Sequence, residues 1–229
     1  MGGKASKILE ETTLVKCSAH GDGSPVICGA PVSEPIEGMK GGKDGRYKLG
    51  DKEVVQIKSH GMIKKHSTVI DSDGKIQAYV VNKTKSMTKG ESYILKTSPS
   101  YEGQEPVDIE LLSKWCGIDK DMKLYGFAKI ESKKTGMTTG KATYSIVDGG
   151  DDKFKQLYEA EKLSTMNFHC VVRSAGGDPV ATLVMAGMTV HVAVRAAEGV
   201  DLAAVLLTAW STFSPDGATA GALAGAGVI

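Results

Sequence analysis

The most constraining feature of this chain is an apolar segment near the C-terminus. Residues 199–229, "GVDLAAVLLTAWSTFSPDGATAGALAGAGVI", contain two charged residues, Asp201 and Asp216, although 24% of the 229 residues in the chain are charged. Asp201 is a typical helix N-cap, and the residues after it are helix formers up to Ser214-Pro215. The sequence therefore predicts a helix over residues 202–213. Its apolar residues include Leu202, Val205, Leu206, Leu207, Ala209, Trp210 and Phe213.

The rest of the chain from Glu53 onward has the pattern of short antiparallel strands. Asp73-Gly74 lies between two runs rich in β-branched residues and is a strong hairpin signal. Further strand candidates are residues 91–97, 123–132, 141–148 and 167–174, followed by "PVATLVMAG" and "MTVHVAVRA". Residues 107–117 and 151–163 fit either a short helix or a strand. Turn-separated strands of this length favour an antiparallel sandwich or barrel.

The helix and the strands together predict how the fold is built. Twelve helical residues span about 18 Å, which is shorter than the roughly 20 residues needed to cross a bilayer core. A helix that is apolar on nearly all sides must be enclosed by protein, and here the enclosing material is β-sheet. A helix packed on one face of an open sheet is the alternative, but Thr208, Ser211 and Thr212 supply at most a narrow polar stripe. We therefore expect a mainly β (α+β) fold, an antiparallel β-barrel around a central C-terminal helix.

Composition divides the chain into three expected segments. Residues 1–50 are rich in Gly, Pro and Lys, which predicts a flexible arm with one short strand around Pro25–Cys28. Residues 51–215 form the expected barrel, and residues 216–229 are a Gly/Ala-rich tail. No lysine follows Lys162, so we expect the C-terminal third to form the interior of the fold.

Charge and cysteine content exclude several classes of protein. A net charge of +1 argues against a nucleic-acid binder, which is usually far more basic. The four cysteines, Cys17, Cys28, Cys116 and Cys170, form no CxxC pair, so neither a zinc site nor a disulfide framework is expected. The absence of a secretory signal predicts a cytoplasmic protein, one that can lie at the cytosolic face of a membrane.

Two stretches resemble the tubby-like superfamily, and its LURP-one-related branch in particular. "TVIDSDGKIQAYVVN" (residues 68–82) is similar to the early hairpin of that family, and "GVDLAAVLLTA" (residues 199–209) is similar to its C-terminal turn and buried helix. The resemblance covers roughly residues 53 to 215. It implies a tubby-like barrel and a membrane-associated or partner-binding adaptor. Phospholipid scramblases share this fold class, but their palmitoylated cysteine cluster and calcium-binding segment are not found here.

Lysines and the N-terminal residues supply the candidate membrane contacts. "MGGKASK" fits the N-myristoylation pattern at Gly2, and Lys4 and Lys7 follow it. One acyl chain binds membranes only marginally, so a second signal is needed. The candidates for binding anionic lipid headgroups, phosphoinositides included, are Lys4, Lys7, Lys64, Lys65, Lys133 and Lys134. The alternative interpretation is that these lysines are a solvated surface that protects strand edges.

Catalytic motifs are weak. The five histidines do not form an HExxH motif, no carboxylates stand at metal-ligand spacing, and no nucleophile has an organised partner. We expect no catalytic residues, no metal and no cofactor. An enzyme ranks third, because the mouth of a barrel can hold a small ligand.

The favoured function is a non-catalytic, membrane-peripheral adaptor that binds anionic phospholipid or a protein partner. The alternative is a structural subunit of a complex or homo-oligomer, assembled through the N-terminal arm and the C-terminal tail. Both ends lack a self-contained fold in the sequence pattern, which motivates this alternative.

Overall fold

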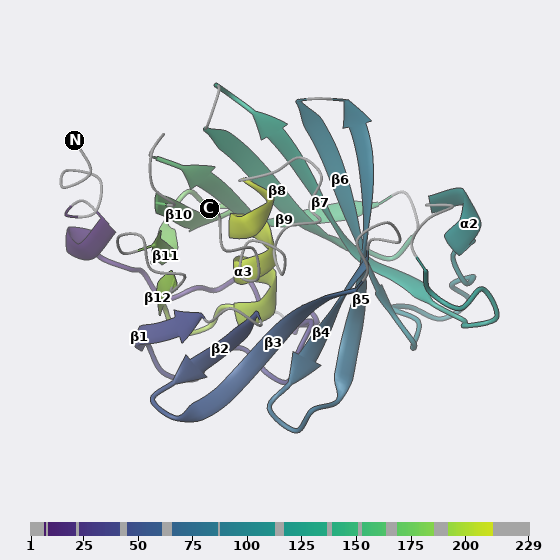
Figure 1. Cartoon of the computed structure of the whole chain (residues 1–229), viewed down its shortest axis with the longest axis horizontal. Coiled ribbons are helices and arrows are strands. Elements are labelled where there is room, and N and C mark those ends of the chain that lie inside the picture. Colours follow the sequence, from purple (N-terminus) through teal and green to yellow (C-terminus); the bar gives the residue numbers. More distant parts are fainter. Residues whose placement is uncertain are drawn as a thin grey trace.

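Twelve antiparallel strands close into a β-barrel in the computed structural model of the chain (Figure 1). The structure describes residues 7, 9–21, 23–41, 45–60, 66–86, 88–112, 117–136, 139–150, 153–163, 169–185 and 192–212. The strands are β1 (Ile36–Gly41), β2 (Arg46–Leu49), β3 (Lys52–His60), β4 (His66–Asp71), β5 (Ile76–Ser86), β6 (Lys89–Lys96), β7 (Tyr125–Lys134), β8 (Gly140–Val147), β9 (Phe154–Lys162), β10 (His169–Ser174), β11 (Pro179–Met185) and β12 (Val192–Ala196). The predicted mainly β barrel is confirmed.

The topology is the simplest one for a closed barrel. Each strand pairs with its neighbours in the chain, and β1 pairs with both β2 and β12 to close the sheet. All of these pairings are antiparallel, so the odd-numbered strands run toward one end of the barrel and the even-numbered strands return to the other. Closure leaves no free sheet edge, which removes the main route to edge-to-edge aggregation.

The C-terminal helix α3 (Leu202–Ser211) lies among the strands, and all ten of its residues are buried. It packs on β7, β8, β9 and β10. Asp201 caps it as predicted, since its side chain accepts a hydrogen bond from the Ala204 N–H. Burying a Val or Leu side chain is worth about 1.5–3 kcal/mol, so this apolar helix stabilises the barrel that surrounds it. Phe213 lies outside the described residues.

The helix α3 runs from one end of the barrel to the other. It follows β12 and therefore runs in the same direction as the odd-numbered strands. A side chain at Gly140, the first residue of β8, would collide with the carbonyl of Thr212 just after the helix. The helix thus begins at the end where even-numbered strands finish and ends where odd-numbered strands finish.

Both ambiguous segments are settled by the structure. Residues 107–117 include a short helix, α2 (Ile109–Leu112), and residues 151–163 include the strand β9. Ile109 and Leu124 pack with Val81 and Leu95 in a second apolar cluster, separate from the cluster that contains α3. The connection between β6 and β7 therefore contributes a small core of its own.

The barrel begins earlier than the sequence predicted. Its first strand starts at Ile36, not near residue 51, and residues 25–28 form no strand. The described residues of 9–35, called the strap below, pack against the barrel where α3 begins. Backbone hydrogen bonds join Val15 N–H to Pro179 O, Cys17 N–H to Glu198 O and Val32 N–H to Val200 O.

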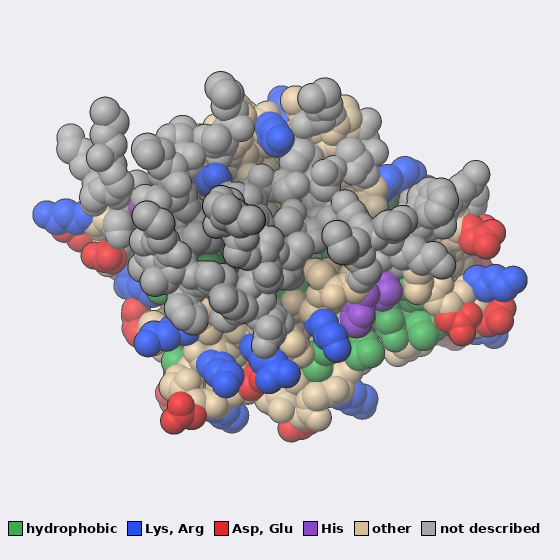
Figure 2. All heavy atoms as spheres, in the orientation of Figure 1, with side chains coloured by type: hydrophobic (Ala, Val, Ile, Leu, Met, Phe, Trp, Pro, Cys, Tyr) green, Lys and Arg blue, Asp and Glu red, His purple; other side chains and the backbone are tan. Residues whose placement is uncertain are grey.

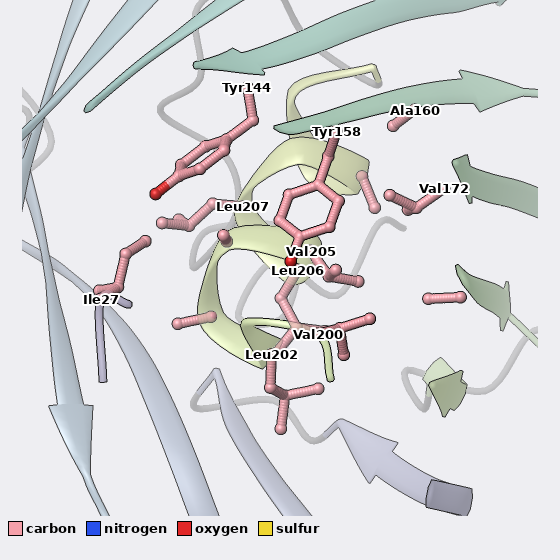
Figure 3. Packing of buried hydrophobic residues seen from close by; sticks show 14 of the residues in the cluster. Ile27, Tyr144, Tyr158, Ala160, Val172, Val200, Leu202, Val205, Leu206 and Leu207 are labelled. Atoms are coloured by element: carbon pink, nitrogen blue, oxygen red, sulfur yellow. The ribbon is translucent and has the colours of Figure 1, made fainter. Parts of the chain in front are cut away.

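The sequence pattern missed the strap because its partners are remote. Its Gly- and Pro-rich residues have weak intrinsic preferences and find their hydrogen-bond partners about 165–180 residues away, among residues 179–201. Ile27 is 1% exposed and lies beside the start of α3 (Figure 3).

Candidate functional site

A buried polar cluster joins the strap to the start of α3. The Asp201 carboxylate accepts hydrogen bonds from the Ile27 N–H (2.6 Å) and the Ala204 N–H (3.1 Å). The Tyr158 hydroxyl accepts one from the Asp201 N–H (3.0 Å) and lies 2.8 Å from His20 Nε2. Burial raises the pKa of Asp201 above its ordinary value. Because these bonds mostly satisfy backbone groups, the cluster is a structural junction.

A second junction holds the strap to the outside of the barrel. The Arg195 guanidinium, on β12, makes a bidentate pair with the Glu37 carboxylate at 2.7 and 3.3 Å. It also donates to the carbonyls of Leu9, Glu10 and Thr12. The planar fork of Arg suits this set of acceptors better than the point charge of Lys. The N-terminal arm is therefore attached to its own barrel over its described residues.

Of the predicted headgroup lysines that the structure describes, the two outside the N-terminal segment lie where an odd-numbered strand ends. Lys133 and Lys134 are exposed and are the last two residues of β7. Lys133 pairs across the sheet with Lys89 on one side and Lys141 on the other. Exposed lysines also stand on β3 and β5 toward the same end. We call this set the basic rim: Lys58, Lys83, Lys89, Lys133, Lys134 and Lys141.

Most of the basic rim is not neutralised by carboxylates. Lys141 lies 3.4 Å from Glu159 and 3.6 Å from Glu161. The other five lysines form no ion pair within the described part of the chain. In the view of Figure 2, lysine and arginine side chains are spread around the outline of the molecule. The rim thus carries positive charge available to an external anion.

The remaining predicted lipid contacts are only partly described. Lys7 is exposed and lies 3.6 Å from Glu11, whereas Gly2, Lys4, Lys64 and Lys65 lie outside the described residues. His60 and His66, the strand ends that flank residues 61–65, are at the same end of the barrel as Lys133 and Lys134. The topology therefore brings the end of β3 and the end of β7, which are 74 residues apart in sequence (His60 to Lys134), to one rim.

Two histidines stack at this end of the barrel. His60 and His66 face each other across β3 and β4, with ring centroids 4.7 Å apart and planes 14° apart. His60 Nε2 lies 2.8 Å from Thr68 Oγ1. Burial, followed by the neighbouring His66 and Lys58, lowers the pKa of His60. Among the described residues, no group of three or more His, Cys, Asp or Glu side chains is placed to hold a metal.

An apolar pocket that the sequence did not predict opens at the opposite end of the barrel. It has a volume of about 380 Å³ and lies between the strap, the β2–β3 hairpin and the first turn of α3. Its apolar lining includes Cys28, Val32, Ile36, Leu49, Val54 and Leu202. Burial, followed by the charges of Asp71 and Asp201, raises the pKa of the Cys28 thiol to about 11. The thiol is therefore neutral and poorly nucleophilic.

No family model, curated protein or solved structure matches this chain. No helix within the described ranges has the length and hydrophobicity needed to cross a bilayer.

Proposed function

We propose that this protein is a non-catalytic, membrane-peripheral adaptor of the tubby-like type, acting at the cytosolic face of a membrane. Its basic rim binds anionic phospholipid headgroups, including phosphoinositides. The observation that carries the proposal is the row of Lys89, Lys133 and Lys141 on three adjacent strands, next to the exposed Lys134. The resemblance of residues 68–82 and 199–209 to the LURP-one-related branch supports the same function.

The charge of the rim is sufficient for moderate membrane binding. Each lysine near an anionic membrane surface is worth about 1 kcal/mol, and the effect decays within a Debye length of about 8 Å at physiological salt. Lys89, Lys133 and Lys134 have no ion pair among the described residues, so they contribute without first losing an intramolecular partner. An acyl chain on Gly2 would supply the second membrane signal that a weak electrostatic contact needs.

The described start of the N-terminal segment is held on the wall of the barrel by β12. The carbonyls of Leu9 and Glu10 are held by Arg195, and Glu10 acts electrostatically on His169, the first residue of β10. Even-numbered strands begin at the end of the barrel that carries the basic rim. Glu10 is therefore within electrostatic range of a residue at that end.

Vesicle co-sedimentation tests the proposal. The protein, made with and without an N-myristoyltransferase, is mixed with neutral, phosphatidylserine and phosphoinositide vesicles at low and physiological salt. We expect the double variant Lys89→Glu, Lys133→Glu to lose at least about 2 kcal/mol of binding to anionic vesicles, or roughly 30-fold. The matched control is Lys52→Glu, Lys75→Glu, which changes net charge equally at the opposite end.

Two results would contradict the proposal. Equal loss in both double variants would mean that only net charge matters, and unchanged binding in the rim variant would remove the rim from the contact. Separately, Gly2→Ala should abolish the extra binding of the myristoylated protein. Equal partitioning of Gly2→Ala and the wild type would exclude the acyl anchor. The role of the basic rim would still be tested by the double variant Lys89→Glu, Lys133→Glu.

A further inference from the structure

Two neighbouring hairpins carry exposed hydroxyl groups among the lysines of the basic rim. Ser86 and Thr88 are exposed at the β5–β6 turn, and Thr135 is exposed at the β7–β8 turn. The Lys134 N–H donates a 2.9 Å hydrogen bond to the Thr88 carbonyl, so the two turns lie side by side. The β5–β6 hairpin projects at the top of the view in Figure 1. An enzyme in solution can therefore reach these hydroxyl groups.

Ser86 stands opposite a lysine in the sheet. It pairs across the hairpin with Lys89, which pairs in turn with Lys133 on β7. The Thr88 N–H (3.3 Å) and the Lys89 N–H (3.1 Å) both donate to Ser86 Oγ. Two backbone donors and two lysine positions thus lie beside one exposed oxygen atom. Lysines and clustered backbone N–H groups are the groups with which proteins hold a phosphate.

The lysines of this row repel one another. Lys89, Lys133 and Lys141 stand directly opposite each other on adjacent strands, and like charges in that arrangement destabilise a sheet. Glu131, Glu159 and Glu161 already have lysine partners, and Glu91 is buried and accepts a hydrogen bond from the Tyr93 hydroxyl. Cations outnumber anions at this end of β5 to β9, where the charged residues are Lys83, Lys85, Lys89, Lys129, Lys133, Lys134, Lys141, Lys162, Glu91, Glu131, Glu159 and Glu161. A phosphate added at Ser86 would therefore relieve the repulsion.

The sequence before Ser86 suits a protein kinase. In "KTKSMTK" (residues 83–89), Lys83 and Lys85 lie three residues and one residue before Ser86. Protein kinases choose their substrates partly by such charge patterns. The lysines that would attract a basic-directed kinase thus lie in the same hairpin as the lysines of the proposed lipid contact.

We propose that Ser86 is a phosphorylation site and that its phosphate switches off the binding of the basic rim to anionic phospholipid. This inference rests on the proposed function. In the reaction, Ser86 Oγ attacks the γ-phosphorus of a magnesium-bound nucleoside triphosphate held by a basic-directed protein kinase. An O–P bond forms at Ser86, and the bond from that phosphorus to the β–γ bridging oxygen breaks. The nucleoside diphosphate leaves, and the hydroxyl proton passes to a base of the kinase.

The phosphate acts on the rim in two ways. It carries about −1.5 to −2 charges at pH 7, so it cancels the charge of about two lysines. It is also tethered beside Lys89 and Lys133, where an intramolecular anion competes with a lipid phosphate at a high effective concentration. Both effects weaken the contact between the basic rim and the membrane.

Phosphate transfer is tested first, without lipid. The full chain is incubated with magnesium ATP and with two kinases that select basic residues before the acceptor, cAMP-dependent protein kinase and protein kinase C. Mass spectrometry maps the modified residue. We expect phosphate on Ser86, none there in Ser86→Ala, and unchanged transfer to Ser86 in Thr88→Ala and Thr135→Ala. Transfer only to other residues, or to none, would overturn the assignment of the site.

Vesicle co-sedimentation then tests the effect on binding. The variant Ser86→phosphoserine, made by genetic incorporation, is compared with Ser72→phosphoserine, a matched control at an exposed serine in the β4–β5 turn at the opposite end. On phosphoinositide vesicles at physiological salt, we expect the first to bind roughly 30-fold more weakly than the wild type, as two cancelled lysine charges predict, and the second less than about threefold. Ser86→Ala should bind as the wild type does. Thermal melting checks that each variant is folded.

The possible failures of this test are distinguishable. If the unmodified wild type binds no anionic vesicle, the proposed function and the switch are both overturned. If the wild type binds and Ser86→phosphoserine binds equally well, only the switch is overturned. Equal weakening by phosphoserine at positions 86 and 72 would also overturn the switch, because net charge alone would then explain the loss.

Discussion

The carboxylate of Asp201 accepts a 2.6 Å hydrogen bond from the backbone N–H of Ile27, a residue 174 positions earlier in the chain. The other carboxylate oxygen caps α3 at Ala204. One buried side chain therefore both starts the central helix and fastens the strap. Folding of the barrel interior and docking of the strap are coupled through it.

Replacing Asp201 should test this coupling. Asp201→Ala removes the cap and leaves the buried Ile27 N–H without an acceptor, and we expect a loss of about 2–4 kcal/mol in the free energy of unfolding. Asp201→Asn keeps one acceptor oxygen and should cost less. Urea denaturation at neutral pH measures both. A stability of Asp201→Ala equal to that of the wild type would show that the strap docks independently of this residue.

The stability of the wild type and of Asp201→Asn should depend differently on pH. Burial raises the pKa of Asp201 in the folded state above the unfolded value of about 3.9. The stability that this group contributes is therefore complete below about pH 3.9 and is lost as the pH rises through the folded pKa. Asp201→Asn has no such group, so its stability relative to wild type should improve from pH 4 toward neutrality. A constant difference between the two proteins would contradict the raised pKa.

Removing the hydroxyl group should lower the free energy of unfolding at one buried tyrosine, Tyr158, but not at the other, Tyr144. Tyr158→Phe removes the acceptor of the Asp201 N–H and the partner of His20, and we expect it to cost about 1–3 kcal/mol. The Tyr144 hydroxyl is buried and has no hydrogen-bond partner in the described part of the chain. Tyr144→Phe should therefore be neutral or slightly stabilising. Chemical denaturation measures the free energy of unfolding of both variants. Equal losses of stability would mean that hydrogen bonding does not distinguish the two hydroxyl groups.

The loss of stability when a glycine at positive φ is replaced by alanine should depend on the space around that glycine. Gly199 has φ +85°, and a Cβ there would collide with the carbonyl of Cys17 in the strap. Gly74, in the β4–β5 turn, has φ +79° and open space around it. Gly74→Ala should cost about 1 kcal/mol of backbone strain, whereas Gly199→Ala should cost at least about 2 kcal/mol more. Thermal unfolding of both variants measures the difference, and similar losses would mean that the strap is not packed on Gly199.

The enclosure of α3 can be tested through its tryptophan. Trp210 is 5% exposed, and its indole N–H donates to the Tyr47 hydroxyl. In a Trp115→Phe background, which removes the other tryptophan, we expect weak quenching of its fluorescence by iodide and acrylamide. Strong quenching in the folded protein would contradict a helix inside the barrel.

The sequence by itself determined the elements whose signals are local. The cap at Asp201 and the apolar residues after it predicted α3, and Asp73-Gly74 predicted the β4–β5 hairpin, because capping and tight turns depend on a few adjacent residues. The need to enclose an apolar helix predicted the barrel. These inferences used neighbouring residues and one physical requirement, the removal of apolar surface from water.

Only the tertiary structure decided the arrangement of the strap and of both ends of the barrel. The strap is held by Asp201, Tyr158 and Arg195, whose positions relative to it depend on closure of all twelve strands. Lys89, Lys133 and Lys141 form a row only through strand register, and the pocket at Leu49 needs three remote segments to meet. Contacts between residues far apart in the chain leave no periodic signal in the sequence, because the closing of the sheet, not local preference, brings them together.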